Sequence, residues 1–206
     1  MRAILLAMCS MLLCVPLLRQ QEPAKPALND DDYAIYSEVM NTSYATEGIE
    51  RIVVGDHTSM GLPPVMMGMA QPGDSPELKK IREAKETTRD FDQRSKQPAA
   101  ALERKFSTKV PVVLISEVER DRIFVIQKSG SKQVPNMKGF DEFHRLYPKS
   151  QGFMSVSRVG YNPARTEALV YVGNLCGGLC GTGQYYLLAR ENNSWKIQVK
   201  ALVWIS

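Results

Sequence analysis

The sequence has few of the residue types that usually carry chemistry. It contains two histidines and four cysteines among 206 residues. No zinc motif, nucleophile elbow or dinucleotide fingerprint is present. Nor does it contain an internal repeat, a low-complexity tract or a block of five like charges. We therefore assign no catalytic residue, no cofactor-binding residue and no metal ligand from motifs, and we expect no cofactor.

The charge balance argues against one class of partner. The chain has 26 Lys and Arg residues against 22 Asp and Glu residues, a formal net charge of +4. The first 20 residues hold two arginines and no acid, so the remainder carries about +2. Nucleic-acid-binding surfaces need basic residues concentrated on one face. We expect no nucleic-acid partner, and the expected partner is a small molecule or protein of unknown identity.

The N-terminus has the pattern of a secretory signal. Met1-Arg2-Ala3 gives a short positive start, and residues 4–18 are almost entirely apolar. A membrane-spanning helix needs roughly 20 apolar residues, and Pro16 interrupts this run. We predict a signal peptide over residues 1–20, a Pro-rich mature segment over 21–30 and no stable membrane span after cleavage. The predicted location is extracytoplasmic, either periplasmic or secreted.

A lipid anchor is the alternative at this end of the chain. Cys9 and Cys14 lie in the apolar run, but large residues, Met8 and Leu13, precede them. A lipoprotein signal has a small residue at that position. We therefore interpret both thiols as apolar residues of the removed peptide.

Residues 31–206 are predicted to form a single α+β domain. The periodicity of apolar residues, with N-caps and β-branched runs, sets the expected elements. Helices are expected over 31–45, from Ser75-Pro76-Glu77 to just before Gln97-Pro98, and over 140–147, and strands over 49–54 and 110–115. Residues 117–126 fit a short helix as well as irregular structure.

The C-terminal part is predicted to be a β-meander over residues 152–206. Apolar and polar residues alternate from Trp195 to Ala201, as a strand with one buried face requires. Further strands are expected over 154–159, 166–172 and 184–189, and short connections favour pairing of sequential strands. We expect helices on one face of a mainly antiparallel sheet. By analogy alone, a cone of the nuclear-transport-factor-2 or cystatin kind would suit this pattern.

Several short motifs occur together in the last 65 residues. They are Phe143-His144-Arg145-Leu146-Tyr147-Pro148, Ser157-Arg158-Val159-Gly160-Tyr161-Asn162, Ala168-Leu169-Val170-Tyr171-Val172-Gly173, Gly183-x-Tyr185-x-Leu187-Leu188, Trp195-Lys196-Ile197 and Trp204-Ile205-Ser206. This pattern resembles that of uncharacterised predicted secreted bacterial proteins. The resemblance implies export and a sheet, and it implies no activity.

Cys176 and Cys180 form the most specific local feature. They are the two cysteines outside the predicted signal peptide, and they flank a glycine-rich turn between two predicted strands. Disulfides persist in extracytoplasmic compartments. We predict a structural disulfide, with a redox pair, a catalytic thiol or a metal pair as alternatives. Residues 177–183 do not fit a phosphate-binding loop, because they lack its lysine and lead into a strand.

The leading functional hypothesis is a non-catalytic extracytoplasmic binding or interaction domain. Folds of this kind often have a pocket between sheet and helices. Candidate pocket aromatics, for most of which core packing is the simpler explanation, are Tyr171, Tyr185, Tyr186 and Trp204.

Two other hypotheses depend on the histidines. A hydrolase could use His144, oriented by Asp141, with Cys180 if the disulfide were absent. A Cu(I) site could use His57 with the thioethers of Met60, Met66, Met67 and Met69. Asp56 with Glu47 or Glu50 is a weaker idea for paired carboxylates. A cleft that holds either histidine beside a carboxylate would favour an enzyme.

Overall fold

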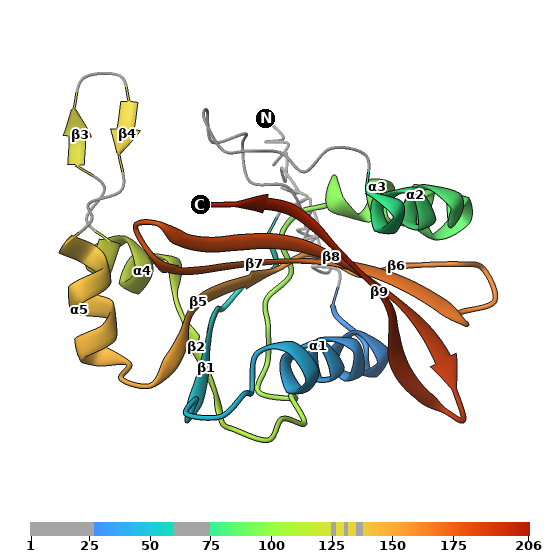
Figure 1. The fold of residues 1–206 in the computed structure, drawn as a ribbon, viewed down its shortest axis with the longest axis horizontal. Helices are drawn as coiled ribbons and strands as arrows, with labels where there is room; N and C mark the ends of the chain where they lie inside the picture. The colour runs from blue at the N-terminus through green and yellow to red at the C-terminus, as the bar shows by residue number, and fades with distance from the viewer. Residues whose placement is uncertain (1–26, 60–74, 125–126, 130–131, 135–137) are drawn as a thin grey trace, which may run out of the picture.

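The computed structural model describes residues 27–59, 75–124, 127–129, 132–134 and 138–206 (Figure 1). The signal peptide predicted over residues 1–20 therefore lies outside the described residues, as do the four loop methionines. The described helices are α1 (Asp30–Ser43), α2 (Pro76–Glu83), α3 (Lys85–Ser95), α4 (Glu117–Phe124) and α5 (Lys138–Leu146). None of them is long and apolar enough to cross a membrane.

One seven-stranded sheet organises the domain. Its strands are β1 (Arg51–Gly55), β2 (Val112–Ile115), β5 (Ser150–Val156), β6 (Gly160–Tyr161), β7 (Glu167–Gly177), β8 (Cys180–Glu191) and β9 (Ser194–Ile205). The spatial order is β2-β1-β5-β7-β8-β9, with β6 paired to β7. A separate hairpin joins β3 (Gln127–Ser129) to β4 (Lys132–Val134).

The α+β class and the C-terminal meander are confirmed. Strands β7, β8 and β9 pair antiparallel in sequence order, and β5 pairs antiparallel with β7. The alternation predicted from Trp195 onward is seen in β9, where Trp195, Val199 and Ala201 are buried and the lysines between them are exposed. A register shift between Ile197 and Val199 puts Trp195 on the α1 side and Val199 and Ala201 on the α2–α3 side, so the buried residues do not share one face. The pairing of the first strand differs from this antiparallel pattern, because β1 pairs in parallel with both β2 and β5.

The helices, which we expected on one face of the sheet, lie on both faces (Figure 1). Helix α1 packs on one face, and α2 and α3 pack on the other. The reason lies in β7, where Ala168, Val170 and Val172 point to the α1 side and Leu169 and Tyr171 point to the α2–α3 side. Because this strand is apolar on both faces, each face needs a covering layer.

Helix α1 begins at a capping box. Asn29 Oδ1 accepts from the Asp32 N–H at 3.1 Å, and the Asp32 carboxylate accepts from the Asn29 N–H at 2.8 Å. Its buried face includes Ile35, Tyr36 and Val39. The apolar spacing noted in the sequence therefore gives the observed packing.

The single helix expected after Ser75 is two helices. The chain departs from helical geometry at Ala84, with φ −75° and ψ 59°. The Thr88 hydroxyl donates to the Ile81 carbonyl oxygen at 2.9 Å across this break. The Thr88 hydroxyl thus bonds a carbonyl oxygen that would accept from a backbone N–H in a continuous helix, and the chain changes direction at Ala84.

The remaining helices cover the sheet near β1 and β2. Of the segment 117–126, which the sequence left open, the described residues Glu117–Phe124 form α4, and the helix expected over 140–147 is α5. Ile123 and Phe143 from these helices pack with Ile115 of β2 and Phe153 of β5. Two members of this cluster, Ile115 and Phe153, also line the hollow described in the next section.

Candidate functional site

The candidate site lies at the carboxyl end of the parallel part of the sheet. β1 and β2 run in the same direction in a register that places Gly55 opposite Ile115. The Asp56 N–H donates to the Ile115 carbonyl oxygen at 2.9 Å and so extends the pairing beyond β1. Carboxyl ends of parallel strands are where open α/β sheets most often bind ligands. The residues that follow both strands therefore come together at one edge.

A hollow of about 290 Å³ is present at this edge. Ile115 and Phe153 contribute apolar surface to it, and charged side chains, those of Asp56, Glu117 and Arg120, contribute polar groups. The other lining residues are mostly small or hydroxyl-bearing: Gly55, Thr58, Ser59, Ala99, Ser116 and Ser155. An apolar base with a few polar groups is the usual make-up of a small-molecule site.

His57 lines the same hollow and is bonded to a carboxylate. Its Nδ1 lies 2.8 Å from Asp56 Oδ1, and the two side chains are 46% and 33% exposed. A carboxylate at Nδ1 favours the tautomer that carries the proton there, which leaves Nε2 as a hydrogen-bond acceptor. The pair therefore has a defined polarity while remaining accessible to solvent.

Backbone hydrogen bonds fix the segment that carries this pair. The Thr58 N–H donates to the Ala100 carbonyl oxygen at 2.8 Å, and the Ala100 N–H donates to Thr58 Oγ1 at 2.9 Å. The Leu102 N–H donates to the Asp56 carbonyl oxygen at 2.8 Å. Because Thr58 is buried and doubly bonded, the backbone on both sides of His57 is held in place.

Arg120 supplies a cation held between two acids. Its guanidinium donates to Glu117 at 3.1 Å and to Asp121 at 2.7 Å. Burial opposes its charge, but these bonds and charges outweigh that effect and raise the pKa of Arg120. Ser116 Oγ accepts from the Glu119 N–H at 3.1 Å at the start of α4. The Ser116 hydroxyl is therefore used as an acceptor for the first turn of α4.

The other predicted site residues lie apart from this hollow. Cys176 and Cys180 are joined as a disulfide, with their Cα atoms 5.0 Å apart. His144 is exposed on α5, and its Nε2 lies 2.9 Å from the Cys176 carbonyl oxygen. The thiol–histidine pair considered for a hydrolase is therefore not formed. Among the described residues, no hydrogen bond joins His144 to Asp141.

The paired-carboxylate hypothesis is not supported by the geometry. Glu50 precedes β1 and pairs with Lys149, whereas Asp56 follows β1 at its other end. The methionine part of the Cu(I) hypothesis falls outside the described residues. Within the described ranges, no three His, Cys, Asp or Glu side chains are grouped so as to hold a metal ion.

The candidate pocket aromatics belong to the core. Tyr171, Tyr186 and Trp204 are buried, and Tyr185 packs edge-on against Phe91. Trp204 Nε1–H donates to the Tyr171 hydroxyl at 2.6 Å. None of the four lines the hollow at Asp56 and His57.

Sequence reasoning named His57 and Asp56 separately, and did not predict that they form a bonded pair in one hollow. The available signal was Gly55-Asp56-His57-Thr58, placed directly after the β-branched run of β1. Neither a protein-family model, nor a curated protein, nor a solved structure matches the chain. The resemblance to predicted secreted bacterial proteins therefore stays a prediction.

Proposed function

We propose that this chain is an exported, non-catalytic binding domain that holds a small amine-bearing molecule in the hollow at Asp56 and His57. The observation that carries the proposal is the bonded Asp56–His57 pair, which lines a concave site with Ile115 and Phe153. A fixed acceptor beside apolar surface orients a ligand that has a polar end and an apolar body.

The charges in the hollow favour a cationic ligand group. The lining holds two acids, Asp56 and Glu117, and one guanidinium, that of Arg120, so acidic side chains outnumber basic Lys and Arg side chains by one. His57 Nε2 adds a further acceptor. A primary amine donates to such acceptors and carries the complementary charge.

The serine and cysteine side chains of the described residues favour binding over catalysis at His57. Within the described ranges, no serine or cysteine side chain is bonded to His57. Ser116 is engaged at the start of α4, and both described cysteines form the disulfide. Export is supported by the apolar N-terminal run and by the disulfide, which an oxidising compartment maintains.

The test follows the imidazole signals of the two histidines by NMR. Small amines, with butylamine as the first probe, are titrated into the protein, and butyrate of the same length serves as the anionic control. We expect the amine to shift the His57 signals and to leave those of His144 in place. Measured by calorimetry, His57→Asn should abolish binding and His144→Asn should retain it. Equal shifts at both histidines, or no shift with any amine, would contradict the proposal.

A hydrolytic role is the second candidate, and the Asp56–His57 bond is the observation that favours it. A histidine with a carboxylate at Nδ1 has the arrangement of a general base. Hydrolysis of p-nitrophenyl acetate by the protein, abolished in His57→Asn and kept in His144→Asn, would support this role. Turnover that is the same in both variants would exclude it.

A further inference from the structure

A second hollow, of about 340 Å³, has a different set of lining residues. One wall is α3, and the other is the turn between β6 and β7. Its lining includes three arginines, Arg89, Arg94 and Arg165, and two acids, Glu86 and Asp90. No residue of this hollow lines the first one. Its function is therefore independent of the function proposed above.

Tyr161 sets the positions of two of these arginines. Its ring centroid is 5.5 Å from the guanidinium carbon of Arg94 and 4.1 Å from that of Arg165. The two guanidinium carbons are therefore at most about 10 Å apart, since both distances end at one centroid. Cation–π contacts thus hold two positive charges close together beside the hollow.

Tyr161 is itself held at its side chain and at its backbone. The Tyr161 hydroxyl donates to the buried Asp32 carboxylate at 2.7 Å, and the backbone N–H of Tyr161 donates to Asp90 Oδ2 at 2.8 Å. Asp90 Oδ2 also accepts from Arg94 Nε at 2.7 Å. Asp90 is therefore already engaged by protein donors, whereas Glu86, the other acid of the lining, accepts no hydrogen bond from any residue that the structure describes.

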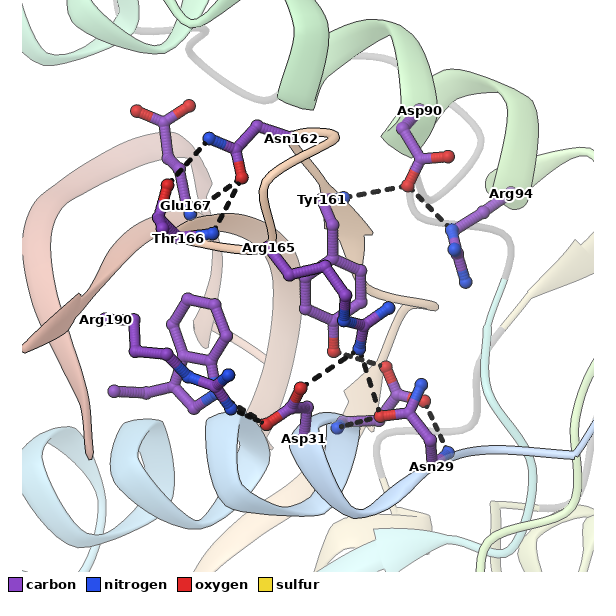
Figure 2. A network of polar contacts seen from close by, with 12 residues as sticks. Asn29, Asp31, Asp90, Arg94, Tyr161, Asn162, Arg165, Thr166, Glu167 and Arg190 are labelled. Carbon is purple, nitrogen blue, oxygen red and sulfur yellow. Dashed lines mark hydrogen bonds and ion pairs between the residues drawn. The ribbon is translucent and has the colours of Figure 1, made fainter. Parts of the chain in front are cut away.

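The three arginines have donors that no hydrogen bond among the described residues uses. Arg94 bonds through Nε, and Arg165 bonds to Asn29 and Asp31 through one terminal nitrogen, so Figure 2 shows the other guanidinium nitrogens without dashed lines. Arg89 is exposed and makes no bond or ion pair within the described part of the chain. By contrast, Arg145 on α5 places both Nε and a terminal nitrogen on Glu142.

We infer that this hollow binds the phosphate or sulfate group of a small esterified molecule. Guanidinium groups match tetrahedral oxyanions because they offer parallel N–H donors at a fixed spacing. Three arginines line one hollow with donors that the described part of the chain leaves unbonded, and two of the three contact the ring of buried Tyr161. An arginine with a purely structural role is expected to be engaged as Arg145 is.

The experiment titrates the full mature chain with glucose 6-phosphate, inorganic sulfate and glucose. It follows the Nε–Hε signals of the arginines by NMR and measures affinity by calorimetry. We expect the two anions, and not glucose, to shift the signals of Arg89, Arg94 and Arg165 while those of Arg145 stay in place. Binding should weaken as salt is raised, because the donors are partly exposed.

Variants at exposed positions keep the test separate from folding. Arg89→Gln should weaken glucose 6-phosphate binding about three- to tenfold, because one charged donor group is lost at a partly exposed site. Glu86→Gln should strengthen it, because the unengaged acid in the lining is neutralised. Arg145→Gln is the matched control and should change nothing.

A lipid source of the same group is distinguished by a vesicle arm. Phosphatidic acid vesicles that bind the protein while glucose 6-phosphate does not would overturn the assignment to a small soluble ester. Failure of all three anionic probes, or equal weakening by Arg89→Gln and Arg145→Gln, would overturn the site itself. The amine titration at His57 gives its own result in either case.

Discussion

Asp31, labelled in Figure 2, and Asp32 are consecutive in α1, and their carboxylates lie in opposite electrostatic surroundings. Asp31 pairs with the guanidinium groups of Arg165 and Arg190 and accepts from Trp195 Nε1–H at 3.2 Å. Asp32 is 2% exposed, and its carboxylate accepts from the Tyr161 hydroxyl and from a backbone N–H.

These surroundings shift the two acids in opposite directions. Burial opposes ionisation of Asp31, but the bonds from Trp195 and Arg165 and the arginine charges outweigh it and lower the pKa of Asp31. For Asp32, burial is the dominant effect and raises its pKa, although its hydrogen bonds act against this. Asp31 therefore stabilises the fold when ionised, and ionisation of Asp32 costs stability.

The first prediction is that Asp31→Asn and Asp32→Asn have opposite pH dependence. A lowered pKa contributes stability above the unfolded value of about 3.9, and this contribution is lost on acidification. The stability deficit of Asp31→Asn should therefore shrink from pH 7 to pH 3. A raised pKa penalises the folded state as pH rises above about 3.9, so the deficit of Asp32→Asn should shrink from pH 3 to pH 7. Urea unfolding at each pH measures both, and parallel slopes would refute the assignment.

The second prediction concerns the close approach of Gly183 to two core aromatics. A Cβ at Gly183 would lie 1.9 Å from Trp204 Nε1 and 2.3 Å from the Tyr171 hydroxyl oxygen. Gly183→Ala should therefore lower the free energy of unfolding by about 1–3 kcal/mol, since these rings must move. In Gly177→Ala the new Cβ would meet only Cys180 Cβ, at 3.5 Å, and stability should stay within about 0.5 kcal/mol. Equal stability of the two variants in urea would contradict this packing.

The third prediction concerns the disulfide. Closing a five-residue loop stabilises the fold by about 2 kcal/mol in the chain-entropy description. The double variant Cys176→Ala/Cys180→Ala should lose about that amount while keeping its far-UV circular dichroism, because β7 and β8 remain paired along their length. A reductant should lower the stability of the parent to that of the double variant and leave the variant unchanged. Two free thiols in protein isolated from its own envelope would count against both the bridge and export.

The C-terminal half of the fold could be predicted from the sequence because its signals are local. Alternation identifies β9 as a strand, although the register shift within it could not be predicted, and short connections favour pairing of β7, β8 and β9 in order. The capping residues before α1 likewise define its start within one residue of the expected position. In each case the deciding residues are neighbours in the chain.

The parallel pairing and both hollows could not be predicted in this way. β1 pairs with β2 and β5, which lie about 60 and 100 residues further along the chain, and no local pattern selects those partners. The contact of Arg94 with Tyr161 likewise joins α3 to β6, which lies about 65 residues further along the chain. Adjacency of Asp56 and His57 was visible, but only the fold places them at an open strand end beside Arg120.

The fourth prediction uses the turn that presents Arg165. Asn162 Oδ1 accepts from the N–H groups of Thr166 at 2.8 Å and Glu167 at 3.0 Å, and Arg165 within this turn has φ +52°. Asn162→Ala removes the acceptor and should cost about 1 kcal/mol of unfolding free energy.

Asn162→Asp separates the role of the turn from that of the proposed anion site. Aspartate keeps an acceptor oxygen for both N–H groups, so stability should stay close to that of the parent. It also adds a negative charge to the lining that includes Arg89 and Arg165, so glucose 6-phosphate should bind more weakly. A stable Asn162→Asp variant with undiminished affinity would show that the anion does not bind in this hollow, because a charge placed in the lining cannot leave an adjacent oxyanion unaffected.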